Sequence, residues 1–253
     1  MKYAGDLTAF SLAGSSVLDT FTNVKFSVTA ETEEGKGGAA RHSLAVPVKR
    51  SFAASADIMR DVSGTRQTTL TLSVANLVAD VIAKVRNLSI NVSNANQECS
   101  GRADGFMTYQ ATGTKFTGSA TLQILDADTT TLMETVNNAT LTSVNTTLSI
   151  TAGGVTLVLP VTLTSAEYST ERDGLILMNV NFEQRGTPTT VTGSTLFTSI
   201  MTGATVVAFV ATITTIGTYT GSTLIESATF TLPETGIITE QYNFKGLGTL
   251  VKS

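Results

Sequence analysis

An internal repeat is the feature that most constrains this fold, because a duplicated chain builds two similar units from one set of rules. Three short, β-prone segments of the first half recur in the same order in the second half. The matched segments are 26–30 with 148–152, 43–48 with 156–161, and 113–119 with 217–222. This order predicts two tandem domains of similar length, residues 1–125 and residues 126–253, each large enough to bury a small core.

Strand patterns dominate the chain and predict a mainly β fold. In residues 155–163, Val and Leu recur at every second position, which is the pattern of a strand with one buried face. Pro47 and Pro160 each interrupt such a pattern. Because proline cannot donate to the hydrogen-bond ladder, we expect both strands to lie at a sheet edge or to carry a bulge. An edge strand in a chain of low charge favours pairing with a neighbouring subunit.

Two segments have the spacing of amphipathic helices, one in each predicted domain. In residues 74–85, six aliphatic side chains fall on one helical face, and Ser73 is placed to cap the start. A shorter helix is predicted after Ser194, with Gly203 as its stop. We expect both apolar faces to pack against a sheet.

A second, weaker repeat lies within the C-terminal half. Eight residues between Ser165 and Thr187 recur at a constant spacing between Ser227 and Thr249. The pattern has two interpretations: each domain has internal pseudo-symmetry, or similar strand–turn–strand arrangements are used twice. The sequence alone leaves both open.

The composition favours self-association and argues against a nucleic-acid-binding role. Charged residues make up 14% of the chain, against roughly 25% in an average soluble domain, and the formal net charge is −4. Neutral β-rich surfaces tend to associate, which favours a closed or stacked homo-oligomer over a monomer. The sequence has no basic stripe that would displace counterions from phosphates. It also has no apolar run of about 20 residues, so we expect no membrane span.

No set of residues predicts an enzyme, a cofactor or a metal site. His42 is the only histidine and has no nearby Cys, which favours an ordinary surface residue over a triad member or metal ligand. Cys99 is the only cysteine, so no intrachain disulfide can form, and it has no evident partner base. Asp126 and Asp128 are too few for calcium, which takes about 6–8 oxygen ligands, and are more simply a polar linker. Without an apolar signal at the N-terminus, we expect synthesis in a reducing cytoplasm.

The two halves differ most after the first matched strand. Residues 31–42 form a charged, Gly-containing segment, whereas the second half crosses the matching gap with little more than residues 153–155. Such a loop is either a flexible surface excursion or a contact device, and we expect a contact role.

The C-terminal part of the chain has a characteristic order of motifs. A short helix ending in Gly203 precedes a strand at 204–207, a turn at 217–221 and a closing aromatic-x-Gly-x-Gly segment within 242–250. This order resembles that of the tail tube (major tail) proteins of long-tailed bacteriophages. In the first half, residues 51–58 resemble the family's strand before its helix. The resemblance covers most of the chain through short motifs.

This resemblance implies two tandem β-sandwich or half-barrel domains, each with a flanking α-helix, in a structural virion protein. Such proteins polymerise as stacked rings into the hollow siphovirus tail tube that conducts DNA to the host cell. Implied partners are further copies of the chain, the tape measure protein, other tail proteins, and double-stranded DNA that passes without specific binding. Because this chain carries two domains, a trimeric ring with pseudo-sixfold symmetry is favoured over a hexamer. The implied location is the virion tail, after synthesis in the host bacterial cytoplasm.

A function of another class remains as the alternative: a carbohydrate-binding or adhesive β-sandwich on a virion or cell surface. Such modules usually expose aromatic rings for sugar stacking. Aromatic residues are only 6% of this chain and Trp is absent, which disfavours that alternative.

Under the tube interpretation, the long loop and the chain termini are the expected ring-to-ring contacts. The loop candidates are Glu31, Glu33, Glu34, Lys36, Arg41 and His42, and the terminal candidates are Lys2, Tyr3, Asp6 and Lys252. We expect edge strands to join neighbouring sheets into an inner barrel, with a polar and acidic lumen. Deletion of residues 32–41 should leave a folded protein that no longer forms tubes.

Overall fold

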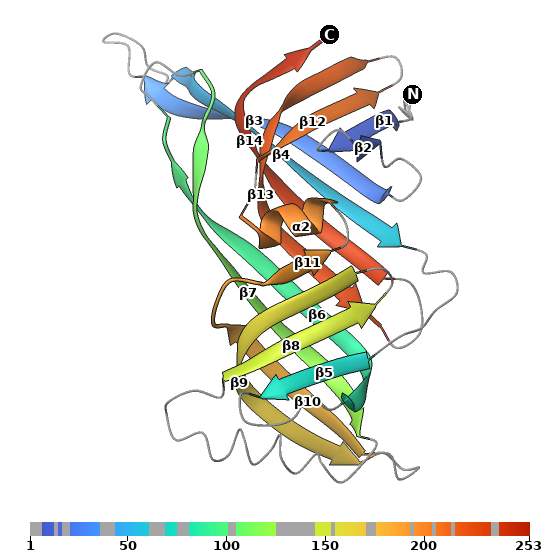
Figure 1. The fold of residues 1–253 in the computed structure, drawn as a ribbon. Helices are drawn as coiled ribbons and strands as arrows, with labels where there is room; N and C mark the ends of the chain where they lie inside the picture. Colours follow the sequence, from blue (N-terminus) through green and yellow to red (C-terminus); the bar gives the residue numbers. More distant parts are fainter. Residues whose placement is uncertain are drawn as a thin grey trace.

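A computed structural model describes the chain as a set of long antiparallel strands (Figure 1). The described residues are 7–12, 15–16, 21–35, 44–60, 69–74, 81–100, 105–124, 145–152, 155–170, 176–192, 195–203, 206–213, 216–233 and 238–253. The strands are β1 (Leu7–Leu12), β2 (Ser15–Ser16), β3 (Phe21–Gly35), β4 (Leu44–Arg60), β5 (Thr69–Val74), β6 (Val81–Glu98), β7 (Tyr109–Ile124), β8 (Asn145–Ala152), β9 (Val155–Thr170), β10 (Ile176–Gln184), β11 (Thr190–Thr192), β12 (Val206–Ile213), β13 (Gly217–Leu232) and β14 (Ile238–Lys252). The helix described among them is α2 (Thr195–Met201).

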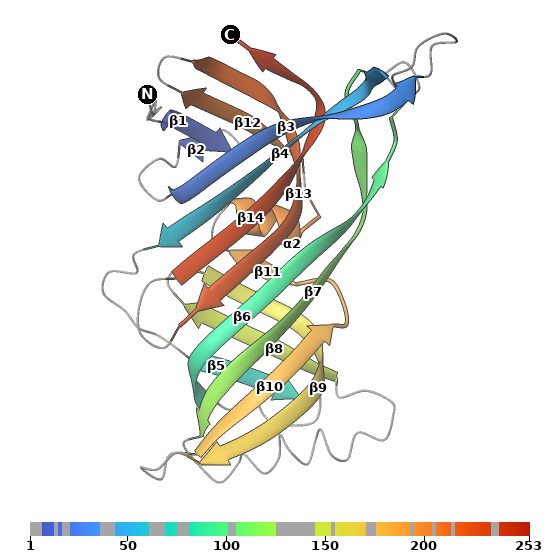
Figure 2. The ribbon, with the colours of Figure 1, turned by 180° about the vertical axis from the view of Figure 1, so that it is seen from behind.

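The described strands belong to one antiparallel sheet, which confirms the predicted mainly β fold. Starting from β3, the hydrogen-bonded order is β3-β4-β14-β13-β6-β7-β10-β9-β8. Figure 2 shows the long strands of this series lying side by side. The core lies on one face of the series, because apolar and polar side chains alternate along each strand. On β14, for example, Tyr242 and Phe244 are buried while Asn243 between them is exposed.

Six of the strands also pair in a closed circle. β6 pairs with β7, β7 with β10, β10 with β9, β9 with β8, β8 with β5, and β5 again with β6. Closure leaves few open edges in this part of the molecule. Figure 1 shows this barrel at one end, the strands β1–β4 and β12–β14 at the other, and α2 between them.

The second predicted helix is confirmed. α2 spans Thr195–Met201 and buries Phe197 and Ile200. The Phe197 and Phe230 ring centroids lie 5.3 Å apart, so the helix packs on β13. The chain leaves the helix through Gly203, whose φ of 82° is a conformation that favours glycine.

The first predicted helix, over residues 74–85, is wrong. Val74 ends β5, residues 81–85 begin β6, and residues 75–80 lie outside the described part. The side chains that fit a helical face are mostly Val and Ile, whose branched Cβ atoms favour strands. Pairing of this segment with β5 and β7 therefore overrides its helical spacing.

The hairpins β3–β4 and β6–β7 match residue by residue, at a constant spacing along the sequence. Each hairpin carries two register shifts, and the two sets fall at matching positions. The shifts lie between Phe21 and Asn23 and between Glu31 and Thr32 in the first hairpin, and between Val85 and Asn87 and between Ala95 and Asn96 in the second. At the same spacing, the buried Phe52 of β4 matches the buried Phe116 of β7. Since each bulge bends a strand at a defined point, matching bulges indicate one shared three-dimensional hairpin.

The three-stranded segments β8–β9–β10 and β12–β13–β14 also match. β8 pairs with residues 155–162 of β9, and β12 pairs with the matching residues 217–224 of β13. A register shift occurs beside Asn181 in one segment and beside Asn243 in the other. At these shifts, Asn181 Nδ2 donates to Ser165 Oγ at 2.7 Å and Asn243 Nδ2 donates to Ser227 Oγ at 2.9 Å. These four residues belong to the weaker sequence repeat, which therefore corresponds to a structural repeat.

These matches divide the sheet into two units. Unit one consists of β3, β4, β12, β13 and β14, and unit two of β6, β7, β8, β9 and β10. In the sheet, β3-β4-β14-β13 is followed by β6-β7-β10-β9, so unit two repeats unit one after four strands. Each unit combines strands from both halves of the sequence, and the hydrogen-bonded sheet is not divided between residues 125 and 126. Separate folding of the predicted domains 1–125 and 126–253 stays a prediction.

The first sequence repeat matches different strands from those that the bulges match. It aligned segments of β3 with β8, β4 with β9, and β7 with β13. The structure instead matches β3 with β6, β4 with β7, and β9 with β13, because these pairs share both their bulges and their neighbours. Thr-rich strands of similar alternation resemble one another locally, and only the pairing distinguishes them.

Residues 31–42 are not a loop along their whole length. Residues 31–35 continue β3 and pair with β4, whereas residues 36–42 lie outside the described part. The end of hairpin β6–β7 matches this hairpin end, so a long extension occurs in both units.

Both strands that contain a proline carry a register shift, which is one of the two predicted alternatives. Pro47 directly precedes the bulge of β4, in a stretch that pairs with β3 and lies outside the residues that pair with β14. Pro160 falls between the residues of β9 that pair with β10 and those that pair with β11. A proline beside a register shift, or between two successive partner strands, lies where a sheet tolerates the missing N–H.

Candidate assembly surfaces

A polar face covers the side of the sheet that points away from the core. Along the series from β3 to β9 it presents mainly Ser, Thr and Asn side chains. Hydrogen bonds join these side chains across neighbouring strands: Thr229 Oγ1 donates to Asn91 Oδ1 at 3.0 Å, and Thr121 Oγ1 donates to Asn179 Oδ1 at 2.9 Å. The face is therefore polar without depending on ionised groups.

The charges on this face nearly cancel. The described charged side chains on it include the cations Lys25, Lys115 and Lys245 and the anions Asp57, Glu167, Glu183 and Glu226. Glu31 and its partner Lys49 continue the same alternation and add one charge of each sign, and Arg86, whose Nε donates to Gln123 Oε1, adds a cation. Lys115 Nζ and Glu183 Oε2 lie 3.2 Å apart, with both side chains at least half exposed. Such exposed pairs contribute about 0–1 kcal/mol to stability. The described part of the face offers no basic stripe to a phosphate backbone.

Within the chain, strands β13 and β6 join unit one to unit two. The junction consists of six residue pairs, from Ser227 opposite Ser93 to Leu232 opposite Leu88. On its core side, Val92 faces Ala228, and the two side chains are 1% and 2% exposed. A backbone ladder and a row of buried side chains together make this a complete strand–strand contact.

The strands that match β6 and β13 are β3 and β9, and they lie at or next to the two ends of the hydrogen-bonded series. β3, which matches β6, pairs with β4, and no described strand covers its other side. β9, which matches β13, carries β8 on residues 155–162, and no described strand lies on that side beyond them. We call residues 24–29 the β3 edge and residues 165–170 the β9 edge.

Burial differs sharply between the β3 edge and its match in β6. Val28 is 51% exposed, whereas the matching Val92 is 1% exposed. Phe26 is half-buried, whereas the matching Ile90 is fully buried. The β3 edge therefore has the apolar pattern of an interior strand without the cover of one.

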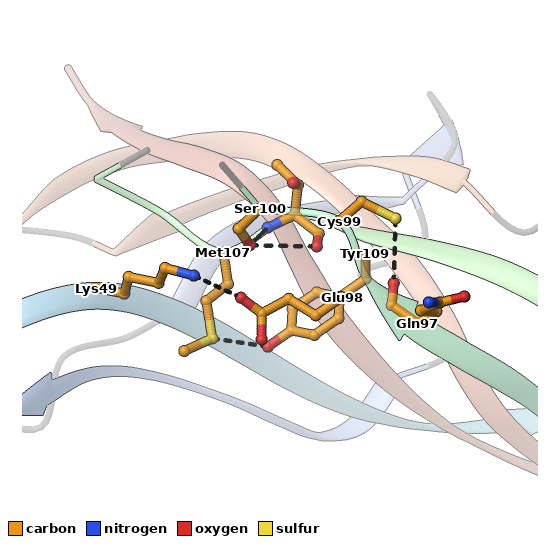
Figure 3. Close-up of polar contacts among 8 residues, drawn as sticks. Lys49, Gln97, Glu98, Cys99, Ser100, Met107 and Tyr109 are labelled. Atoms are coloured by element: carbon orange, nitrogen blue, oxygen red, sulfur yellow. Dashed lines mark hydrogen bonds and ion pairs between the residues drawn. The ribbon is translucent and has the colours of Figure 1, made fainter. Parts of the chain in front are cut away.

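Lys49 and Glu98 connect the extended ends of the two hairpins, as Figure 3 shows. Lys49 Nζ on β4 lies 2.8 Å from Glu98 Oε1 on β6. The hydrogen bonds from Lys49 and Ser100 hold the pKa of the Glu98 carboxyl below its usual value. Burial, followed by the negative charge of Glu98, raises the pKa of Tyr109, whose hydroxyl donates to Met107 Sδ at 2.8 Å. This cluster links unit one to unit two at the far end of their strands.

The predicted contact residues are partly outside the described structure. Glu31, Glu33 and Glu34 lie in β3, opposite Lys49, Val46 and Ala45 of β4. Lys252 ends β14 opposite Tyr219, with its Nζ 6.0 Å from the centre of that ring. Lys2, Tyr3, Asp6, Lys36, Arg41 and His42 lie outside the described residues. A ring-to-ring role for any of these residues stays a prediction.

Sequence reasoning expected edge strands to pair between subunits, but it did not assign that role to residues 24–29 and 165–170. A signal for them exists in the match between residues 23–28 and residues 87–92, which share Asn at the first position and Val at the last. The apolar residues alternate in phase in both segments. That pattern is common in β proteins, and it gains meaning only from the shared bulges.

The described residues contain no group of three or more His, Cys, Asp or Glu side chains placed to hold a metal ion. Cys99 is exposed and its thiol lies 3.5 Å from the carbonyl oxygen of Gln97 (Figure 3). Among the described residues, no helix is long and apolar enough to span a membrane; α2 has seven residues.

Comparison with known proteins gave low-level likeness to solved structures alone. No family model matches the chain, and no curated protein matches it. Among solved structures, a chain from the virion of a native gene transfer agent particle aligns with 51% of this chain and 100% of its own length, at 14% identity and a TM-score of 0.39. A likeness at this level carries no argument about function.

Proposed function

We propose that this chain is a structural virion protein that forms the hollow tail tube of a long-tailed bacteriophage. Copies join side by side into rings, the rings stack, and double-stranded DNA passes through the bore to the host cell. The observation that carries the proposal is the repetition of one sheet unit after four strands, with the same bulges. A sheet unit that repeats in the same direction is the element from which a cyclic wall is built.

Two units per chain favour three chains per ring. A ring of three chains contains six units around its axis, which is the pseudo-sixfold symmetry that the resemblance to tail tube proteins implies. A ring of six chains contains twelve units. The symmetry is then threefold for the chains and nearly sixfold for the sheet. A closed ring uses the same heterologous contact at every chain boundary.

The polar face is the part of the surface suited to line the bore. Its Ser, Thr and Asn side chains bond to one another across strands, and its few charges nearly cancel. DNA phosphates find no row of cations there, so DNA passes without specific binding. Before DNA enters, the same bore accommodates the tape measure protein, and other tail proteins contact the ends of the tube.

Negative-stain electron microscopy of the purified protein at high concentration tests the proposal. The expected result is hollow tubes whose end views show six lobes, with a mass per ring of three chains. Six chains per ring would keep the function and refute the stoichiometry. Persistent monomers that bind immobilised glycans would favour the adhesive β-sandwich instead.

A further inference from the structure

We propose that the contact between neighbouring chains repeats, in detail, the β13–β6 junction inside each chain. In this contact the β3 edge of one chain pairs antiparallel with the β9 edge of a second copy. The inference rests on the proposed function and deepens it, because it names the partner, the two strands and their register.

The register follows from the matched positions. Within the chain, Val92 of β6 lies opposite Ala228 of β13. Val28 matches Val92 through the two shared bulges, and Ala166 matches Ala228 through the shared Asn–Ser bulge. Val28 therefore lies opposite Ala166 of the next chain, and Ser27 opposite Glu167.

The β9 edge has the length and position that this pairing needs. On β13, residues 217–224 carry β12 and residues 227–232 carry β6. On β9, the matching residues 155–162 carry β8, and the six residues 165–170 match those that carry β6. The strand direction also fits, because a shift of four antiparallel strands restores the original direction.

Burial supports the same partner. Val24, Phe26 and Ala166 are half-buried and pack against the core, while their matches Leu88, Ile90 and Ala228 are at most 2% exposed. Val28 is 51% exposed where Val92 is 1% exposed. A second copy in this register would give these side chains the cover that their matches already have, which is the gain expected from burying an apolar edge.

The charges on the polar side of the contact are complementary. Lys25 lies on the β3 edge and Glu167 on the β9 edge, and in the proposed register they are diagonal neighbours across the two strands. Opposite charges at this spacing attract and disfavour alternative registers that place Glu167 away from Lys25.

Disulfide trapping tests both the contact and its register. In a Cys99→Ser background, the variant Ser27→Cys/Glu167→Cys is concentrated, oxidised and run on a non-reducing gel. We expect covalent dimers and trimers that disappear on reduction. The internal control is Asn91→Cys/Thr229→Cys, whose side chains already meet across β6 and β13, and which should cross-link within one chain at any dilution.

A register control uses Ser27→Cys/Ser169→Cys, which places the second thiol two residues farther along β9. We expect its interchain product to form several-fold more slowly; faster formation would overturn the register. Single-cysteine variants exclude contacts between two copies of β3 or of β9, and circular dichroism verifies that every variant folds.

Electron microscopy of the same samples separates the two proposals. Hollow tubes without a Ser27→Cys/Glu167→Cys cross-link would overturn the β3–β9 contact and keep the tube. Cross-linked trimers that never form tubes would keep the contact and refute the tube. Uncross-linked monomers at every concentration would overturn both.

Discussion

Val92 and Val28 occupy matching positions in the two units, and substituting each by alanine should have opposite consequences. Val92 is 1% exposed in the junction between β6 and β13, whereas Val28 is 51% exposed on the β3 edge. We expect Val92→Ala to destabilise the monomer and Val28→Ala to weaken assembly while leaving the monomer nearly unchanged.

The magnitudes follow from these exposures. Val→Ala removes two buried carbons at position 92, which is about 1.5 kcal/mol of transfer free energy at about 0.8 kcal/mol each. The cavity left in a packed junction raises the loss to about 2–3 kcal/mol. At position 28 half of the side chain already contacts water and no closed cavity forms, so the loss stays below about 1 kcal/mol. For a chain of this size, Val92→Ala should lower Tm by about 4–12 °C.

Urea unfolding of dilute monomer, followed by far-UV circular dichroism, measures the first effect. Sedimentation of concentrated protein gives the concentration at which assembly begins, and Val28→Ala should raise it several-fold. Equal losses of unfolding free energy in the two variants would refute the reasoning, because Val28 would then already be covered in the monomer. An unchanged assembly threshold for Val28→Ala would also refute it.

Three further predictions concern other parts of the fold. A Cβ at Gly118 would overlap the Phe182 ring, so Gly118→Ala should reduce the free energy of unfolding by about 1–3 kcal/mol in a urea titration. Lys49→Met should raise the pKa of Glu98 towards its usual value, as measured by NMR. In the unaltered protein, the stability that the Lys49–Glu98 pair contributes is fully present above the pKa of Glu in the unfolded chain. It is lost as the pH falls through the lower pKa of Glu98 in the folded chain. Deletion of residues 32–41 should preserve the far-UV spectrum and abolish tubes in electron micrographs; normal tubes would remove the contact role of that segment.

Local signals explain what the sequence predicted correctly. Period-two alternation marks the strands, and helical spacing with Gly203 marks α2, because both depend on residues within a few positions of each other. The failed helix over residues 74–85 shows the limit of such signals. Its Val and Ile side chains fit a helical face, but they are also strand formers, and pairing with distant strands decides between the two.

Pairing between distant strands explains what the sequence could not predict. The bulges depend on how two strands face each other, and the match of β3 to β6 emerges only from them. β14 is the last strand in the chain, yet it lies in the sheet between β4 and β13. Because β14 occupies that side of β4, β3 pairs with the other side of β4 and forms the end of the sheet. The weaker repeat between Ser165 and Thr249 was visible, but nothing local showed that its two copies lie in neighbouring units.

The β13–β6 junction has a kinetic consequence for a tube built from this chain. Every second boundary between units forms when the chain folds, so only the remaining boundaries depend on protein concentration. A ring of three chains has three boundaries between separate molecules, whereas a ring of six separate units has six, and tethering lowers the entropic cost of nucleation. The two kinds of boundary can then specialise. Inside the chain, the buried pair Val92 and Ala228 belongs to a permanent boundary, whereas in the proposed contact Lys25 and Glu167 suit a boundary that ionic strength can regulate.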